Sequence, residues 1–160
     1  MHATEMNPTR FAELMEAITG RIDGRALDKA LEADLNRRFP AGGDVFRSVQ
    51  DACGAAIADG WMCNREHAGI RYGRVVKPGP ATHGYSVDVV EMENVAGGHH
   101  AHPTGEIDLV MPLSGNAEFD GHGAGWLVYE PGTAHTPTVR GGKALVLYLL
   151  PQGAIEFTKA

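Results

Sequence analysis

GGHHAHPTGEIDLVMP, residues 97–112, is the stretch of sequence that decides how the chain folds. Within ten residues it holds three histidines and two carboxylates, and an apolar run follows at once; the five are His99, His100, His102, Glu106 and Asp108. Side chains at i and i+2 lie on the same face of a strand, so His100 and His102 can point the same way. The proline and glycine that follow predict a turn, after which Glu106 can lie opposite both histidines on a neighbouring strand.

Imidazole nitrogens and a carboxylate oxygen around one point make a ligand set suited to a divalent transition metal. The alternative is a polar, solvent-exposed loop whose histidines cluster by chance, because histidine-rich tracts are suggestive and no more. A second segment favours the metal site over the exposed loop. YEPGTAHTP, residues 129–137, supplies His135 after a Pro-Gly turn between two apolar runs, and a closed site needs such a ligand from a distant strand.

Composition limits the class of protein. A chain of 160 residues suits a single domain, or one core with a modest extension. The net charge of −6 argues against non-specific binding to nucleic acid or to anionic membranes. No apolar run approaches the ~20 residues of a membrane span. The polar, acidic start does not resemble a signal peptide, so we expect a cytoplasmic protein with reduced thiols, in which Cys53 and Cys63 are packing residues.

The first third of the chain reads as helical. Asn7-Pro8 is typical of an N-cap followed by proline at the first helical position. Apolar residues then recur at spacings of three and four in three stripes within residues 7–60, which predicts three short amphipathic helices, the third beginning at Asp44. Such helices are not stable alone, so residues 1–62 should pack on the remainder or on a partner chain.

From Trp61 onward short β-rich runs alternate with Gly and Pro. The clearest predicted strands are residues 70–76, 85–92, 107–113, 126–129 and 144–150. Many short strands with regular turns indicate an antiparallel sandwich or barrel over residues 63–160.

The metal-binding pattern resembles that of the cupin superfamily. Its first motif is met by His100-Ala101-His102, Glu106 and Gly115, and its second by Pro131-Gly132-Thr133-Ala134-His135. There are two departures: Asn94 stands where a glycine is usual, and Gly115 falls two residues late. The resemblance implies a mainly β fold, a cupin-type double-stranded β-helix (jelly-roll barrel) with a helical N-terminal extension. It also implies a metal on His100, His102, Glu106 and His135.

The whole layout is similar to the small cupin-like 4-hydroxylaminobenzoate lyases of bacterial nitroaromatic breakdown. What carries this similarity is the helical first third followed by ADGWMC, RYGRVVKP, YSVDVVEM, HHAHPTGEID and LVYEPGTAHTPTV. The resemblance implies conversion of 4-hydroxylaminobenzoate to 3,4-dihydroxybenzoate (protocatechuate) with release of ammonia. Fold alone does not establish function, so the site has to support this reaction.

A flat aromatic acid needs a cation for its carboxylate. The more apolar face of residues 70–76 carries Tyr72 and Arg74, which predicts that both point into the barrel. An enclosed Arg74 could bind the substrate carboxylate bidentately, or it could form a structural pair with Asp88 or Glu91. Tyr72 and Tyr85 could line the ring pocket, with core packing as the alternative for each.

At the other end of the substrate, the metal would polarise the N–OH oxygen or activate a water. Asp108 shares strand parity with Glu106, so it could serve as a proton shuttle or as a partner of a ligand histidine. His99 has the opposite parity and should lie outside.

Three histidines and a glutamate accept Fe, Mn, Ni, Cu or Zn, so the pattern does not fix the metal.

Two other functions use the same pattern. One is another metal-dependent cupin enzyme, such as a dioxygenase or isomerase on a small organic acid, and the other is a non-catalytic ligand- or metal-sensing cupin. The expected partners are a small aromatic-acid substrate and further copies of the chain, in a homodimer or larger assembly.

Overall fold

Helices form the first third of the chain in the computed structural model, which describes residues 6–158. They are α1 (Pro8–Ile22), α2 (Lys29–Arg38) and α3 (Asp44–Ala58). The predicted start of α1 is confirmed, because the Asn7 side chain accepts a hydrogen bond from the Arg10 backbone N–H at 2.9 Å and proline follows it. In the same way, the Asp28 side chain caps α2. No helix in the described part of the chain is long and apolar enough to cross a membrane.

Strands follow the helices. They are β1 (Arg65–His67), β2 (Ile70–Val76), β3 (Tyr85–Ala96), β4 (His100–His102), β5 (Glu106–Pro112), β6 (Glu118–Phe119), β7 (Gly125–Tyr129), β8 (Thr133–His135), β9 (Thr138–Pro151) and β10 (Glu156–Phe157), with a 3₁₀ turn, η1 (Pro80–Thr82), before β3. Within residues 6–158 the larger sheet has the order β1-β2-β3-β9-β5-β7, with β6 on β9, and the smaller sheet has the order β10-β4-β8. All the pairings are antiparallel.

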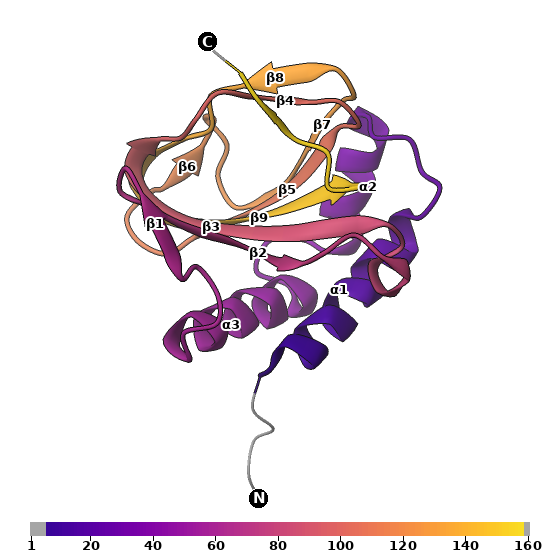
Figure 1. The fold of residues 1–160 in the computed structure, drawn as a ribbon, viewed down its shortest axis with the longest axis horizontal. Helices are drawn as coiled ribbons and strands as arrows, with labels where there is room; N and C mark the ends of the chain where they lie inside the picture. Colours follow the sequence, from indigo (N-terminus) through magenta and orange to yellow (C-terminus); the bar gives the residue numbers. More distant parts are fainter. Residues whose placement is uncertain (1–5, 159–160) are drawn as a thin grey trace, which may run out of the picture.

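The two sheets face each other across the inside of a barrel, with β4 and β8 opposite β3, β9 and β5 (Figure 1). The fold is therefore mainly β, a double-sheet jelly-roll barrel with a helical N-terminal extension, as the sequence indicated. The predicted strands 70–76 and 126–129 are confirmed to within one residue, whereas β3 and β9 run further than predicted.

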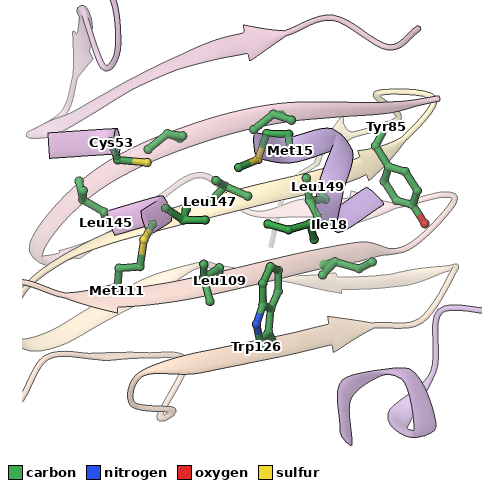
Figure 2. Packing of buried hydrophobic residues seen from close by; sticks show 14 of the residues in the cluster. Met15, Ile18, Cys53, Tyr85, Leu109, Met111, Trp126, Leu145, Leu147 and Leu149 are labelled. Atoms are coloured by element: carbon green, nitrogen blue, oxygen red, sulfur yellow. The ribbon is translucent and has the colours of Figure 1, made fainter. Parts of the chain in front are cut away.

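The helices cover the outer face of the larger sheet (Figure 1). Side chains from α1 and α3, among them Met15, Ile18 and Cys53, form one hydrophobic cluster with Leu109 and Leu147 of the sheet (Figure 2). Every one of these five side chains is buried. The helical region is thus packed against the barrel of its own chain, which supplies the apolar surface that such short helices need.

The inner face of the same sheet lines the barrel. Its apolar cluster includes Met92, Val110 and Val146. On β5 the even-numbered residues point into the barrel and the odd-numbered ones toward the helices, as the two-residue period of a strand requires. Glu106 and Asp108 have the inward parity and are fully buried.

The chain changes sheets between the histidine pair and Glu106. β4 pairs with β8 and β10, whereas β5 pairs with β7 and β9, so Glu106 reaches the histidines from the facing sheet and not from an adjacent strand. Gly105 makes this tight crossing possible. Its φ is +88°, and a Cβ there would lie 2.9 Å from the Tyr129 carbonyl oxygen.

Candidate metal centre

Four side chains from three strands converge inside the barrel. One ligand atom each from His100 and His102 on β4, Glu106 on β5 and His135 on β8 lies within 4.8 Å of the others. Register explains the convergence on the smaller sheet, because His100 is the direct cross-strand partner of His135. Sequence reasoning chose these four residues, and the structure brings all four together.

The three imidazoles present the same nitrogen to the centre. Glu106 Oε1 lies 3.2 Å from His100 Nε2 and 3.3 Å from His102 Nε2, and Glu106 Oε2 lies 3.4 Å from His135 Nε2. The Nε2 atoms of His100 and His135 are themselves only 3.1 Å apart. Two imidazole nitrogens and a carboxylate approach this closely without repulsion when they share a proton or a metal cation.

The other nitrogen of each ring is held from behind. His100 Nδ1 donates to the Gly98 carbonyl at 3.2 Å, which leaves Nε2 with a free lone pair because a carbonyl can only accept. His102 Nδ1 lies 3.0 Å from Thr133 Oγ1, and His135 Nδ1 lies 2.5 Å from Asp120 Oδ2. These contacts fix the ring orientations and aim the Nε2 atoms inward.

The donor set fits a transition metal. Among the described residues, His102 Nε2 and Glu106 Oε2 are buried without a hydrogen-bond partner, although both face the shared centre. Buried polar atoms without partners are costly, and a metal ion would satisfy them. Burial alone would raise the pKa of Glu106, but the three imidazoles around it hold that pKa well below its usual range, so the carboxylate stays ionised, which is the form that binds a metal.

Asp120 is a functional candidate that sequence reasoning missed. Its Oδ2 accepts from His135 Nδ1 and from the Tyr129 hydroxyl, each at 2.5 Å, and its Oδ1 accepts from the Thr138 backbone N–H at 3.0 Å. Burial lowers the pKa of His135, but the bonds to Asp120 and Glu106 outweigh it and raise that pKa to about 9. The only signal in the sequence was a turn aspartate before a glycine.

Asp108 lies behind the cluster. It is fully buried, and neither of its carboxyl oxygens has a hydrogen-bond partner within residues 6–158. Burial and the charge of Glu106 raise the pKa of Asp108 well above its usual value. Its cross-strand neighbour on β9 is Tyr148, whose pKa burial also raises well above its usual value.

A cavity of about 960 Å³ reaches the cluster at His100. Tyr148 and Met92 lie with His100 on its lining, and Tyr72 and Arg74 of β2 border it as well. Such a volume is ample for a small aromatic acid.

Of the predicted substrate residues, two border this cavity and one does not. Arg74 forms the structural pair that the sequence left open as an alternative, with its Nε 2.9 Å and its Nη2 3.2 Å from the Asp88 carboxylate. Tyr72 is partly exposed. Tyr85 packs in the hydrophobic cluster under the helices (Figure 2), because its odd-numbered position on β3 points away from the barrel, so a place for it in the ring pocket does not fit the structure.

His99 lies outside the cluster, as its parity predicted. Its Nδ1 is 2.8 Å from Thr158 Oγ1 near the end of the described chain. Cys53 and Cys63 are buried free thiols, and burial raises the pKa of Cys63 to about 12, which agrees with packing roles.

Comparison with known proteins identifies clear relatives. A family model described as PnbB, 4-hydroxylaminobenzoate lyase, matches residues 13–157. A 4-hydroxylaminobenzoate lyase from Nocardioides sp. (strain LMS-CY) is 33% identical over 145 residues, which cover 85% of this chain and 86% of that protein. A protein of the same name from Pseudomonas putida is 27% identical over 154 residues, covering 86% of this chain and 88% of that protein.

Solved structures give more distant similarities. An RmlC-like cupin protein from Ralstonia eutropha superposes with a TM-score of 0.42 and 16% identity, over 57% of this chain and 61% of that one. The polyketide cyclase RemF from Streptomyces resistomycificus gives a TM-score of 0.42 and 12% identity, over 58% of this chain and 73% of that one.

Proposed function

The chain belongs to the 4-hydroxylaminobenzoate lyase family, and from this we propose that it is a lyase that converts 4-hydroxylaminobenzoate and water to 3,4-dihydroxybenzoate and ammonia. The observation that carries the proposal is a largely buried cluster of three histidines and a glutamate, of which His100 borders a cavity of about 960 Å³ that has ample room for an aromatic acid. The reaction balances without an oxidant, because cleavage of the N–O bond supplies the oxidising equivalents for the ring carbon that gains oxygen.

We assign His100, His102, Glu106 and His135 as ligands of a divalent transition metal, which when bound supplies a Lewis acid for the N–OH oxygen or for a water. The residues around them hold the ligands in place. Gly98, Thr133 and Asp120 fix the Nδ1 atoms. Burial of His100, His102 and Glu106 keeps bulk water away from their side chains. The identity of the metal among Fe, Mn, Ni, Cu and Zn stays open to measurement.

For the substrate carboxylate we propose Arg74. Asp88 and Gly153 accept hydrogen bonds from its Nε and Nη2 atoms, so Nη1 is the group left to bind a carboxylate. The paired Asp88 reduces the net charge that a carboxylate meets, and it also holds the guanidinium in one orientation. Tyr72 would contact the ring from β2.

Asp108 is proposed as the residue that holds a proton near the ligands. It sits one inward position beyond Glu106 on β5, and its two oxygens are free of other partners in the described structure. A carboxyl oxygen of Asp108 could give its proton to the reacting oxygen or nitrogen during N–O cleavage and ammonia release, and burial together with the ionised Glu106 raises the pKa of Asp108 so that the proton is held until then. Glu106 would thereby act both as a ligand and as a catalytic residue.

The test is an assay of the purified chain with 4-hydroxylaminobenzoate under anaerobic conditions, with ammonia and 3,4-dihydroxybenzoate both quantified and metal content measured on the same sample. Release of the two products in equal amounts without oxygen supports the lyase. Turnover that requires oxygen indicates a dioxygenase, and binding without turnover indicates a sensor; either result overturns the proposal. A cytoplasmic location and a homodimer or larger assembly remain predictions.

A further inference from the structure

The chain after β9 crosses the barrel from one sheet to the other. Figure 1 shows this last segment running from the end of β9, in the larger sheet, toward β4 and β8 in the smaller one. It turns at Gln152 and Gly153, both of which have positive φ. It then forms β10, in which Phe157 is the cross-strand partner of the ligand candidate His100.

This crossing segment, residues 151–158, is fastened at both ends. The Thr104 hydroxyl donates to the Pro151 carbonyl at 2.8 Å, and Arg74 Nη2 donates to the Gly153 carbonyl at 3.3 Å. At its far end, the Thr158 backbone N–H donates to the His99 carbonyl at 3.0 Å. The segment is therefore a fixed wall of the cavity.

Phe157 stands out on this wall. It is 71% exposed, the most exposed of the large apolar side chains in the described structure, and it borders the cavity. Its ring centroid lies 5.6 Å from that of His100, so the ring stands directly beside the candidate metal ligand. An aromatic ring left in water next to a cavity forgoes burial that a ligand could provide.

A second exposed ring borders the same cavity. Tyr72 is 36% exposed and belongs to β2 of the larger sheet, whereas Phe157 belongs to β10 of the smaller sheet. The two rings therefore flank the cavity from different sheets. Leu113, which is 45% exposed, is not among the residues that line this cavity.

We propose that Phe157 is a specificity-determining residue, whose ring packs against the aromatic ring of the substrate and selects flat rings over saturated ones. The inference rests on the proposed function for the identity of the substrate, but binding of an aromatic acid is measurable without turnover. Aromatic pairs gain stabilisation from offset-stacked or edge-to-face geometry beyond the area they bury, and a puckered ring offers no π-face for it.

The experiment is isothermal titration calorimetry of the metal-loaded chain with two matched ligands, 4-hydroxybenzoate and trans-4-hydroxycyclohexanecarboxylate. Both carry one carboxylate and one hydroxyl, and neither is a chelating catechol. For Phe157→Leu, we expect affinity for 4-hydroxybenzoate to fall about fivefold to tenfold and affinity for the saturated acid to change less than twofold. Phe157→Tyr, which keeps the ring, should retain the wild-type preference.

The matched control is Leu113→Ala, which removes an exposed apolar side chain elsewhere and should leave both affinities unchanged. Thermal unfolding of each variant verifies that it folds. Wild-type affinity of Phe157→Leu for 4-hydroxybenzoate, an equal loss for both ligands, or no binding of 4-hydroxybenzoate by the wild type overturns the inference. The proposed function fails separately, when the wild type binds 4-hydroxybenzoate with the expected dependence on Phe157 but releases no ammonia from 4-hydroxylaminobenzoate.

Discussion

The two faces of β5 are equally buried and chemically opposite. Toward the helices the strand presents Ile107, Leu109 and Met111, and toward the barrel it presents Glu106 and Asp108 before returning to apolar residues. The five side chains named here are fully buried. Burial alone therefore does not distinguish a stabilising position from a functional one; the parity of the residue along the strand does.

The outer face of β5 adds to the stability of the fold, whereas the buried carboxyl groups of the inner face reduce it. Side chains such as Leu109 gain free energy by leaving water, whereas a buried carboxylate without a partner costs free energy. The helices that cover the outer face thus support a barrel interior that is less stable than an all-apolar one would be. Substitutions on the inner face should therefore change mainly metal binding and activity, and substitutions on the outer face should change mainly the free energy of unfolding.

The largest effect on the inner face is expected for His102→Ala. Loss of one of four ligands should lower metal affinity by more than about 100-fold, beyond the loss caused by removing an outer hydrogen-bond partner, and reduce ammonia release to background. Elemental analysis of the purified variant checks this. Metal retained at wild-type stoichiometry would refute the four-ligand assignment.

The counterpart on the outer face is Leu109→Ala. Truncation of this fully buried leucine should lower the free energy of unfolding by about 2–5 kcal/mol, through lost burial and the cavity left behind. Urea denaturation measures the change. The folded fraction should still bind metal as the wild type does, and a comparable loss of metal affinity would mean that the two faces are not separable.

A smaller effect is expected when the support of a ligand is weakened. Asp120→Asn removes the charge that holds His135 Nδ1 but keeps the shape of the side chain, so metal affinity should fall about tenfold. Competition with a chromophoric chelator gives the affinity. Glu118→Gln, which neutralises an exposed carboxylate on β6, is the control and should leave the affinity unchanged; equal effects of the two substitutions would mean that only net charge matters.

The smallest change in stability is expected for Asp108→Leu, and it has the opposite sign to that of Leu109→Ala. This substitution replaces a buried carboxyl group, which has no hydrogen-bond partner among residues 6–158, by an apolar side chain of similar shape, so the metal-free chain should become more stable by about 1 kcal/mol while ammonia release is lost. Urea unfolding of both chains after chelation tests this. A destabilised variant would show that Asp108 has a partner in solution.

The difference in stability between the wild type and Asp108→Leu should depend on pH. Burial and Glu106 raise the pKa of Asp108 in the folded chain above the ordinary value of 3.8, so the folded state holds this proton more tightly than the unfolded state does. The wild type therefore loses this contribution to stability as the pH rises from about 3.8 toward the folded-state pKa. The stability advantage of Asp108→Leu should widen over that range.

Much of the barrel and the four ligand candidates could be predicted because their signals are local. The two-residue period places His100 and His102 on one face, and a turn of proline and glycine marks where the chain reverses before Glu106. The predicted strands were too short where polar residues extend the backbone pairing of a strand. An example is β9, which begins at Thr138 and not at residue 144. In such a strand, pairing with neighbours outweighs the composition of the segment.

What could not be predicted depends on contacts between distant segments. Asp120 meets His135 only because β6 pairs with β9 and a left-handed residue turns the carboxylate inward, and neither feature has a sequence period. Tyr72 and Tyr85 look alike in the sequence, yet the strand parity of each places one at the cavity and the other under the helices. The role of an aromatic residue was thus set by register, which the chain fixes only on folding.

The crossing segment has a practical consequence for handling the protein. Thr158, the last residue that the structure describes, is hydrogen-bonded to His99 and follows Phe157, which borders the cavity. We expect an affinity tag or fusion partner at this end to hinder the entry of small molecules more than one at the other end would. The start of α1 lies on the far side of the larger sheet (Figure 1), so fusions at that end are the better choice for metal analysis and for kinetics.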